Sequence, residues 1–331
     1  MKAVVTGATG FLGRKTARRL QGLGYNVIAL GRNQEIGEML QREGLAFEAV
    51  DLNETQRLKA VCAGADYVIH CAALSSPWGD YDAFYSANVL GTQSILAACD
   101  QACLKRFVHI STPSLYFQFD ERLNIAEDDP LPATFVNHYA ETKYLAERVV
   151  DEAFQQGMPV ITIRPRALFG PEDHTIIPRL IETNRKKFIP LIHDGQALLD
   201  LTYVENVVEA ILLCMDSPEA SLGEKYNITN GERVHLKDIL EKVFDQLDMP
   251  FNTKKIPFSV AFSLAGLMEW GAKHFRNNEE PPLTRYTVSV LAKSQTLSIE
   301  KAKRELGYEP RISIEEGIQQ FVTWWKEEKH D

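Results

Sequence analysis

Lys2-Ala-Val-Val-Thr-Gly-Ala-Thr-Gly-Phe-Leu-Gly13 begins the chain as an apolar strand that runs directly into three glycines. Gly7 permits a tight turn, Gly10 lets the backbone approach a phosphate, and Gly13 lets the following helix pack closely against the strand. The helix expected over Phe11–Gln21 would present its free amides and the positive end of its dipole to phosphates. A strand, a Gly-x-x-Gly-x-x-Gly turn and a helix in this order predict a dinucleotide-binding site.

The composition is that of an ordinary globular protein, with 45% apolar and 24% charged residues. A length of 331 residues suits one dinucleotide-binding domain and a substrate-binding part. The net charge of −9 argues against a nucleic-acid partner, because binding to a phosphate backbone needs basic patches.

The five cysteines include no Cys-x-x-Cys pair and no cluster with histidines, so we expect reduced thiols and no metal site. Cys99 and Cys103 are expected one helical turn apart and are interpreted as packing residues. The first strand begins at residue 2, which leaves no room for a signal peptide. We therefore expect a cytoplasmic protein.

Short apolar strands alternate with helical segments through the first half of the chain. This alternation predicts an α/β fold, a Rossmann-type doubly wound parallel sheet with helices on both faces. Residues 1–165 would form the NAD(P)-binding domain, and residues 166–331 mostly a smaller, partly interleaved substrate-binding region, with segments near 200–230 returning to the first domain. The strands expected after the first are Asn26–Leu30, Ala46–Val50, Asp66–Cys71, Arg106–Ser111 and Pro159–Arg164, and the helices between them are Gln34–Glu43, Glu54–Ala63, Tyr81–Ala102 and Asn137–Gln156.

The segment Pro257–Met268 carries no charge, and its apolar residues would lie on every side of a helix. Twelve residues are too few to span a bilayer, which takes about 20 residues. A buried helix is the preferred interpretation. The alternative is that the helix forms an apolar wall or lid over an apolar substrate. Such a helix could also make a peripheral membrane contact.

Tyr139 and Lys143 lie four residues apart near the start of an expected helix and therefore share one face of it. A neighbouring ammonium would lower the pKa of the tyrosine, so that the phenol exchanges a proton with a substrate oxygen near neutral pH. Ser111 and Thr112 end the preceding strand and would bring hydroxyl groups to the same edge of the sheet. The other interpretation is that these hydroxyls only satisfy backbone groups at the strand end.

Asn88 lies in the middle of an expected helix, where asparagine is a poor helix former. It would either hydrogen-bond the backbone of a kinked helix or hold a water molecule that relays protons to Lys143. Both roles can hold at once.

The second strand ends with Ala29-Leu-Gly-Arg32, at a position where a site for a free ribose 2′-hydroxyl usually carries a carboxylate. Arg32 can instead pair with a 2′-phosphate through its planar fork, or lie on the surface stacked on adenine. Arg14, Lys15 and Arg18 would add positive charge nearby. We therefore expect NADP(H) as the preferred cofactor and NAD(H) as the alternative.

Several motifs, in their order along the chain, resemble those of the extended short-chain dehydrogenase/reductase superfamily (the NAD(P)-dependent epimerase/dehydratase superfamily). The resemblance covers nearly the whole chain. Its motifs are Gly7-x-x-Gly10-x-x-Gly13, His70-Cys-Ala-Ala73, Asn88-x-x-Gly-Thr92, Ser111-Thr112, Tyr139-x-x-x-Lys143 and Arg164-Pro165.

The resemblance implies a role for each catalytic candidate. Tyr139 would be the general acid/base, Lys143 would hold the nicotinamide ribose, and Asn88 would support a proton relay. Thr112, with Ser111 beside it, would occupy the catalytic serine/threonine position. Cofactor contacts are implied for Gly7, Thr9, Gly10, Phe11, Leu12, Gly13, Arg32, Asp51, Leu52, Ala72, Ala73, Tyr139, Lys143 and Pro165.

Within the superfamily, the segments 110–115, 164–171, 201–206 and 306–310 are similar to the 3β-hydroxysteroid dehydrogenase branch. In that branch, Ser111-Thr-Pro-Ser114 resembles the bacterial 2-alkyl-3-oxoalkanoate reductases. The resemblance implies an NAD(P)-dependent oxidoreductase that interconverts a secondary alcohol and a ketone on a small apolar substrate. The reacting carbon would lie β to a carboxylate or on a sterol ring, and Arg166 or Arg179 would meet the carboxylate.

A nucleotide-sugar epimerase would use the same Tyr139 and Lys143 and is the alternative function. A sugar dehydratase usually carries an acidic pair after the catalytic threonine, whereas this chain has Pro113-Ser114 there. A non-catalytic NADP-sensing protein is less favoured, because such relatives typically lose the tyrosine or the lysine. The resemblance also implies a homodimer through the helices expected over 81–102 and 137–156.

Overall fold

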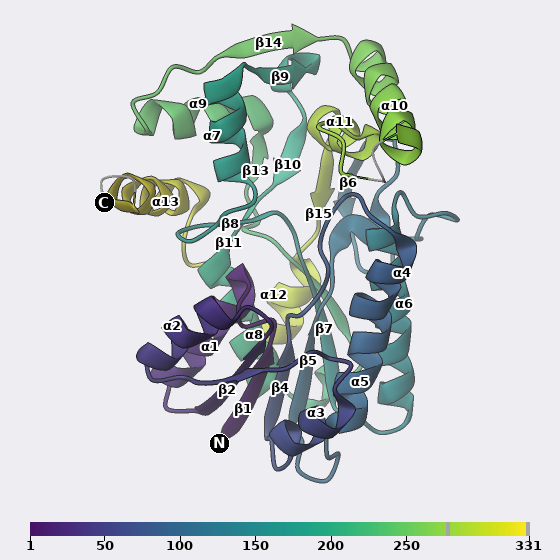
Figure 1. Cartoon of the computed structure of the whole chain (residues 1–331), viewed down its shortest axis with the longest axis vertical. Coiled ribbons are helices and arrows are strands. Elements are labelled where there is room, and N and C mark those ends of the chain that lie inside the picture. Colours follow the sequence, from purple (N-terminus) through teal and green to yellow (C-terminus); the bar gives the residue numbers. More distant parts are fainter. Residues whose placement is uncertain (276–278, 329–331) are drawn as a thin grey trace.

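The computed structural model describes residues 1–275 and 279–328. A seven-stranded parallel sheet, in the order β12-β7-β5-β4-β1-β2-β3, forms its lower part (Figure 1). The α/β fold expected from the alternating pattern is thus confirmed, and each expected strand of the first half begins and ends within about one residue of its predicted bounds. The strands are β1 (Lys2–Thr6), β2 (Asn26–Gly31), β3 (Ala46–Ala49), β4 (Tyr67–His70), β5 (Arg106–Ile110), β7 (Val160–Pro165) and β12 (Lys225–Ile228).

Helices cover both faces of the sheet, with α1, α2, α8 and α12 on one face and α3, α5 and α6 on the other (Figure 1). Alternate residues of each central strand point to opposite faces, so Val5 and Val108 are buried on the first side and Val4 and Phe107 on the second. The strand β12 and the helices α8 and α12 come from later in the chain than β7. The helix bounds are α1 (Phe11–Gly22), α2 (Gln34–Arg42), α3 (Thr55–Cys62), α5 (Gly91–Ala98), α6 (His138–Gln155), α8 (Val204–Asp216) and α12 (Glu300–Leu306).

The helix expected over Tyr81–Ala102 is interrupted and shorter than predicted. α4 (Tyr81–Phe84) passes into a wider π-helical stretch (Tyr85–Leu90), which continues into α5. Cys99 follows the end of α5 with an extended backbone. The expectation that Cys99 and Cys103 lie one turn apart on a helix was therefore wrong.

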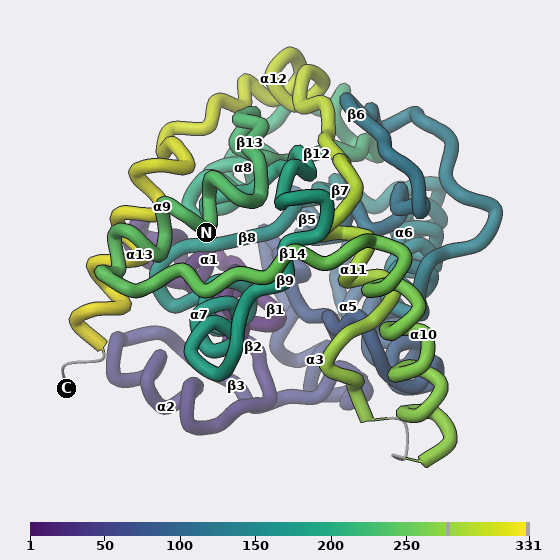
Figure 2. The backbone as a smooth tube through the Cα atoms, turned by 90° about the horizontal axis from the view of Figure 1, so that it is seen from above, coloured from purple at the N-terminus to yellow at the C-terminus, as the bar shows by residue number. Residues whose placement is uncertain are grey.

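The second part of the molecule lies over the carboxyl ends of the parallel strands (Figure 1). It contains a four-stranded sheet in the order β13-β10-β15-β6 and two strand pairs, β8 with β11 and β9 with β14. Seen from above, α9 and α13 lie on one side of this part and α10 and α11 on the other (Figure 2). The bounds are β6 (Arg122–Ile125), β8 (Leu168–Phe169), β9 (Ile189–Ile192), β10 (Leu198–Asp200), β11 (Thr202–Tyr203), β13 (Arg233–His235), β14 (Thr253–Ile256), β15 (Gln295–Leu297), α7 (Ile177–Lys186), α9 (Leu236–Gln246), α10 (Phe258–Phe275), α11 (Arg285–Ala292) and α13 (Ile314–Glu328), with 3-10 turns at Pro113–Tyr116, His193–Gly195 and Glu219–Ser221.

The uncharged segment forms most of α10, but its interpretation as a buried helix was wrong. The face of α10 that packs inward carries the small residues Ala261, Ala265 and Ala272. Phe258 and Phe262 are partly buried against the same cluster, whereas other large apolar residues point outward, with Leu267 67% and Trp270 55% exposed. Alanines provide the packing face because they let α11 and β9 approach closely. Among the described helices, none is long and apolar enough to cross a bilayer.

The turn from β1 into α1 depends on Gly7 and Gly13. Gly7 has a φ of 67°, and a Cβ there would lie 2.7 Å from the backbone nitrogen of Ala72. A Cβ on Gly13 would lie 2.3 Å from the carbonyl oxygen of Gly7. The helix therefore approaches the turn more closely than any side chain at position 13 would allow.

We expect Gly13→Ala to lower the free energy of unfolding by about 1–3 kcal/mol, because the added methyl group meets backbone that cannot yield without distorting the turn. Gly22→Ala is the matched control, since Gly22 lies on the same helix and faces open space. The control should be unchanged or up to about 1 kcal/mol more stable, because alanine is the better helix former. Urea unfolding measures both variants, and equal changes would contradict this account of the turn.

Candidate active site

A cavity of about 500 Å³ opens at the carboxyl ends of β1 to β4, and we call it the nucleotide cavity. Gly7, Thr9 and Gly10 line it from the glycine turn, and Arg32 and Asp51 line it from the ends of β2 and β3. No acidic side chain lies in the first turn of α1, so its free amides favour an anion there. The predicted contacts Leu52, Ala72 and Ala73 also line this cavity, together with Val50, Asn53 and Ser86, which the motifs did not indicate.

A second cavity, of about 590 Å³, continues from the first because Cys71 and Ala73 line both. We call it the reaction cavity. Gly13 lines neither cavity and instead packs α1 against the turn. The residues present fit a dinucleotide, whose adenosine and pyrophosphate the nucleotide cavity would hold and whose nicotinamide end the reaction cavity would hold. The predicted site residues that line the reaction cavity are Phe11, Leu12, Ser111, Thr112, Tyr139, Lys143 and Pro165.

Tyr139 lies in the first turn of α6, which Asn137 caps by accepting a hydrogen bond from the Ala140 amide at 2.9 Å. The Tyr139 hydroxyl is hydrogen-bonded to the side chains of Ser75 and Thr112. Burial raises the pKa of Tyr139, and these two hydrogen bonds act in the opposite direction. The phenol is therefore protonated near neutral pH and can act as a proton donor.

The prediction that the pKa of Tyr139 is lowered was wrong, because burial raises it. Lys143 is buried one turn further along α6, and its Nζ donates to the Ile110 carbonyl at 2.7 Å. Burial lowers the pKa of Lys143 to about 8, while the Glu147 carboxylate opposes this shift. An ammonium has three donors, so Lys143 can still bind a ligand hydroxyl in the reaction cavity.

Two buried histidines lie beneath Lys143. His109 Nε2 is 3.4 Å from the lysine Nζ, and its ring stacks on that of His70 with centroids 5.6 Å apart. The His70 ring in turn bridges the Thr6 hydroxyl at 2.7 Å and the Thr92 hydroxyl at 3.0 Å. Burial lowers the pKa of both histidines, that of His70 to about 3, and the Lys143 charge acts in the same direction. Both rings are therefore neutral near pH 7.

Asn88 is buried in the π-helical stretch between α4 and α5. Its Oδ1 accepts from the Leu74 amide at 2.7 Å, and its Nδ2 donates to the Leu74 carbonyl at 3.2 Å and to the Thr142 hydroxyl at 3.0 Å. These bonds connect the segment that carries Ser75 to the helix that carries Tyr139. Asn88 lines neither cavity, so it acts here as a positioning residue that binds backbone.

Arg164 on β7 and Glu147 on α6 form a buried ion pair, with side chains only 4% and 3% exposed. The guanidinium Nε and Nη2 donate to the two carboxylate oxygens at 2.8 Å and 2.6 Å, and Nη1 donates to the Tyr116 hydroxyl. Burial by itself would raise the pKa of Glu147, but Arg164 holds it below its usual value. This bidentate pair fixes α6 against the sheet two turns beyond Tyr139.

The positive charge that α1 was expected to add near Arg32 is paired with carboxylates. Arg18 lies 2.7 Å from Glu43, and Lys15 lies 4.0 Å from Glu205. Arg14, Lys15 and Arg18 each place a nitrogen 2.7–2.9 Å from the Glu172 carboxylate. Sequence reasoning missed Glu172 because it follows β8, far along the chain from α1. Arg32, in contrast, is 75% exposed at the rim of the nucleotide cavity, with Nη1 3.9 Å from Asp51 Oδ2.

Arg166 and Arg179 both line the reaction cavity, but their surroundings differ. Arg166 is partly buried, and its Nη1 donates to Gln295 Oε1 at 2.5 Å. No carboxylate lies within ion-pair distance of Arg166 among residues 1–275 and 279–328. Arg179 is 68% exposed and lies 3.8 Å from Glu280. Arg166 thus faces the reaction cavity without a direct ion-pair partner among the described residues, although the charge of the buried Asp200 carboxylate acts on it.

Ser75 and Tyr286 are two site residues that the sequence analysis missed. Ser75 contacts the Tyr139 hydroxyl, and its position just after the His70-Cys-Ala-Ala73 motif was a usable signal. The Tyr286 hydroxyl lies 3.3 Å from Ser114 Oγ, and its ring lines the reaction cavity. Tyr286 lies on α11, and no local pattern connects that helix to Tyr139 before the chain folds.

The model of the family described as "NAD dependent epimerase/dehydratase family" matches residues 3–229. An uncharacterized protein of Escherichia coli, YbjS, is 38% identical over 99% of this chain and 98% of its own length. A 2-alkyl-3-oxoalkanoate reductase of Stenotrophomonas maltophilia is 34% identical over 97% of this chain and 98% of its own. The decarboxylating sterol-4-alpha-carboxylate 3-dehydrogenase of Mus musculus is 30% identical over 97% and 90%.

Solved structures agree on the fold. UDP-glucuronic acid 4-epimerase from Bacillus cereus, in complex with NAD, superposes with a TM-score of 0.79 over 99% of both chains. Its sequence identity of 22% makes this a likeness of fold alone.

Glu147→Gln should lower the free energy of unfolding by about 3–5 kcal/mol, because it leaves the Arg164 guanidinium buried without its counter-charge. Glu152→Gln is the matched control, since it removes an exposed carboxylate from the same helix and should change stability by less than about 0.5 kcal/mol. Chemical unfolding of both variants measures the difference. A loss below about 1 kcal/mol for Glu147→Gln would contradict the role given to this ion pair.

Proposed function

Because the chain belongs to the NAD-dependent epimerase/dehydratase family, we propose that it is an NAD(P)-dependent oxidoreductase that interconverts a secondary alcohol and a ketone on an apolar carboxylic acid. The reacting carbon lies β to the carboxylate. Tyr139 provides the proton and Arg166 binds the carboxylate.

The observation that carries this proposal is the position of Arg166. Its guanidinium lines the same cavity as Tyr139 and has no carboxylate within ion-pair distance in the described part of the chain. Burial lowers the pKa of Arg166, and a bound carboxylate would compensate this cost by charge-assisted hydrogen bonds. A substrate that carries an anion close to its reacting carbon therefore suits this cavity.

The names of the two functionally named relatives describe substrates with this same arrangement. A 2-alkyl-3-oxoalkanoate has its oxo group β to the carboxylate, and a sterol 4α-carboxylate has its carboxylate on the carbon beside C3. Apolar side chains of Leu168, Ile176, Val290 and Leu291 line the reaction cavity and suit the hydrocarbon part of such a substrate.

The proposed reaction uses four residues around the reaction cavity. Thr112 and Ser75 hold the hydroxyl of Tyr139, and in the reductive direction Tyr139 Oη gives its proton to the ketone oxygen as that oxygen gains charge. The bound reduced nicotinamide supplies the hydride for the carbonyl carbon. Lys143, which lines the reaction cavity, would keep a positive charge there and would hold the nicotinamide ribose.

Oxidation of a 2-alkyl-3-hydroxyalkanoic acid and of a 3β-hydroxysteroid, followed at the absorbance band of the reduced nicotinamide, tests the proposal. Turnover of the hydroxy acid is expected. Tyr139→Phe should abolish turnover while cofactor binding stays near normal, because it removes a proton donor and little volume. Arg166→Gln should raise the KM for the acid at least about tenfold and have little effect on its methyl ester, which lacks the charge.

Retained turnover in Tyr139→Phe would contradict the assignment of Tyr139 as the general acid. No turnover of either substrate, together with NAD that co-purifies tightly, would favour a nucleotide-sugar epimerase. This is the second candidate function because the structural neighbours share its fold.

We further propose NADP(H) as the preferred cofactor, with NAD(H) as the alternative. Arg32 follows β2 at the rim of the nucleotide cavity, where a carboxylate would be expected for a free ribose 2′-hydroxyl. Its exposed guanidinium supports binding of a 2′-phosphate through two parallel hydrogen bonds.

Arg32→Asp should lower the ratio of kcat/KM with NADP to that with NAD at least about tenfold, because a carboxylate repels the 2′-phosphate and accepts from a 2′-hydroxyl. Arg42→Asp is the matched control, since this exposed arginine lies at the end of α2, outside the residues that line the nucleotide cavity. Parallel kinetics with the two cofactors give the ratio. An unchanged ratio for Arg32→Asp would mean that Arg32 does not bind the 2′-phosphate.

A further inference from the structure

The Tyr139 hydroxyl is the first of four hydroxyl groups that follow one another in space. It is hydrogen-bonded to the Thr112 side chain, whose Oγ1 donates to Ser114 Oγ at 3.1 Å. Ser114 Oγ in turn lies 3.3 Å from the Tyr286 hydroxyl. These two distances are longer than those of an ordinary O–H···O bond, as is common for catalytic hydrogen bonds before a substrate binds. We call Tyr139, Thr112, Ser114 and Tyr286 the hydroxyl series.

The hydrogen bonds of Thr112 give the hydroxyl series a direction. A threonine hydroxyl has one proton to donate and two lone pairs that accept. The Thr112 proton goes to Ser114 Oγ, and one lone pair accepts from the Ser114 amide at 3.2 Å. The other lone pair therefore accepts from the Tyr139 hydroxyl. A proton that leaves Tyr139 can thus pass outward through Thr112 to Ser114, and rotation of the hydroxyl groups allows the opposite direction.

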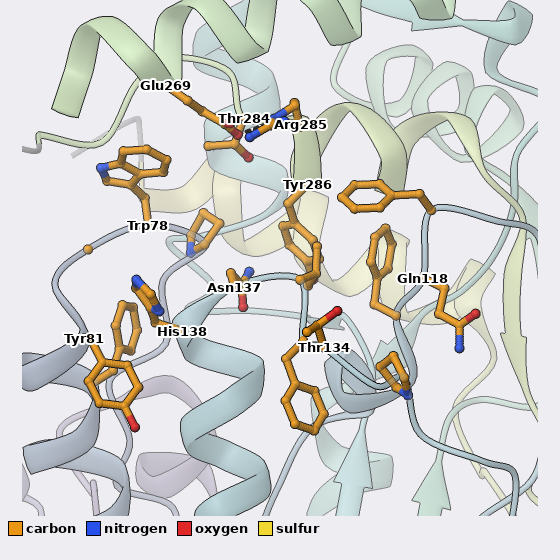
Figure 3. A pocket seen from close by; sticks show the side chains of 18 of the residues that line it. Trp78, Tyr81, Gln118, Thr134, Asn137, His138, Glu269, Thr284, Arg285 and Tyr286 are labelled. Carbon is orange, nitrogen blue, oxygen red and sulfur yellow. Dashed lines mark hydrogen bonds and ion pairs between the residues drawn. The ribbon is translucent and has the colours of Figure 1, made fainter. Parts of the chain in front are cut away.

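The outer end of the hydroxyl series reaches a further cavity, of about 650 Å³, between α6 and the helices α10 and α11 (Figure 3). We call it the outer cavity. Tyr286 lines both the outer cavity and the reaction cavity. Exposed side chains of Thr134, His138 and Lys273 also line the outer cavity, so water reaches it from outside.

Two contacts hold the Tyr286 hydroxyl at this position. Thr284 caps the first turn of α11, which carries Tyr286, by accepting from the Thr287 amide at 3.0 Å. The Phe117 ring meets the Tyr286 ring edge-on, with centroids 4.9 Å apart. The phenol is therefore fixed with its hydroxyl beside Ser114.

The proposed reaction requires such a path, because each turnover exchanges one proton between Tyr139 and water. Tyr139 lines the reaction cavity but not the outer cavity, so a substrate bound in the reaction cavity separates it from water there. On the side of Lys143, the neighbouring side chains of His109 and Asn88 are buried in the core. Both donors of Asn88 Nδ2 are already used by the Leu74 carbonyl and the Thr142 hydroxyl.

We propose that the hydroxyl series is the path by which protons move between Tyr139 and water, with Ser114 and Tyr286 as relay residues. This inference rests on the proposed function. In the oxidative direction, the Tyr139 proton passes to Thr112 Oγ1, the Thr112 proton to Ser114 Oγ, the Ser114 proton to Tyr286 Oη and the Tyr286 proton to water. The transfers are concerted, so no alkoxide forms on Thr112 or Ser114.

The resulting Tyr139 phenolate accepts the proton of the substrate hydroxyl, while two electrons leave the substrate as the hydride that the oxidised nicotinamide takes up. One proton is thus released to water for each alcohol that is oxidised. In the reductive direction, every transfer is reversed, and water resupplies the proton that Tyr139 gives to the ketone oxygen.

The test follows oxidation of the 2-alkyl-3-hydroxyalkanoic acid at saturating substrate and cofactor. Ser114→Ala and Tyr286→Phe interrupt the hydroxyl series but leave Tyr139 in place, so kcat should fall at least about tenfold with little change in the KM for the acid. Ser114→Thr keeps a hydroxyl at this position and should retain most of the wild-type kcat. Added imidazole at constant pH should raise kcat of Tyr286→Phe, because it can carry protons through the outer cavity, and should leave the wild-type kcat unchanged.

The double variant Ser114→Ala/Tyr286→Phe should be no slower than the slower single variant, because two interruptions of one path are not additive. Tyr81→Phe is the matched control, since Tyr81 also lines the outer cavity but is not part of the hydroxyl series (Figure 3). Its kcat should equal that of the wild type.

A wild-type kcat in both single variants would overturn this inference and leave the proposed function intact. So would losses that add in the double variant, or a loss in Tyr286→Phe that imidazole does not reverse, because both indicate a structural effect. Absence of turnover by the wild-type protein would instead overturn the proposed function, and the inference with it.

Discussion

The buried ion pair between Glu147 and Arg164 is the contact on which the geometry of the site depends. Tyr139 and Lys143 lie on the same helix as Glu147, so their distance from the sheet follows from the place where the carboxylate meets the guanidinium. Removing two charges from water is costly, and here both hydrogen bonds of a bidentate pair, together with the Tyr116 hydroxyl, compensate for that cost. The pair therefore fixes the register of α6 against β7 rather than simply adding stability.

Burial also determines the charges of the groups packed around Lys143. His70 and His109 are neutral because they are buried, and the Lys143 ammonium lies in contact with His109. Tyr139 keeps its proton because its ring is enclosed, while Ser75 and Thr112 hold its hydroxyl toward the cavity. A protonated phenol beside a buried ammonium is an arrangement suited to giving a proton to a carbonyl oxygen.

The second part of the molecule determines what can reach this phenol. β7 leads out of the sheet to Arg166, and α11 brings Tyr286 into the wall of the reaction cavity. α10 packs inward through Ala261, Ala265 and Ala272 and exposes Leu267 and Trp270 on its outer face. The same parallel sheet and the same Tyr139 and Lys143 can thus serve quite different substrates in the family, because the substrate contacts come from elements that the sheet does not dictate.

The local sequence was sufficient for the sheet, the glycine turn and the pairing of Tyr139 with Lys143 on one helix, because alternation of apolar strands, glycine spacing and helical period act over a few residues. It could not predict that Glu172 would pair with Arg14, Lys15 and Arg18, that the Ile110 carbonyl would accept from the Lys143 ammonium, or that Ser75 and Tyr286 would join the site. The prediction that α10 is buried was also wrong, because an apolar sequence alone does not indicate which face of a helix packs against other elements. Those features arise only from contacts between segments far apart in the chain, where burial and charge pairing depend on the completed tertiary structure.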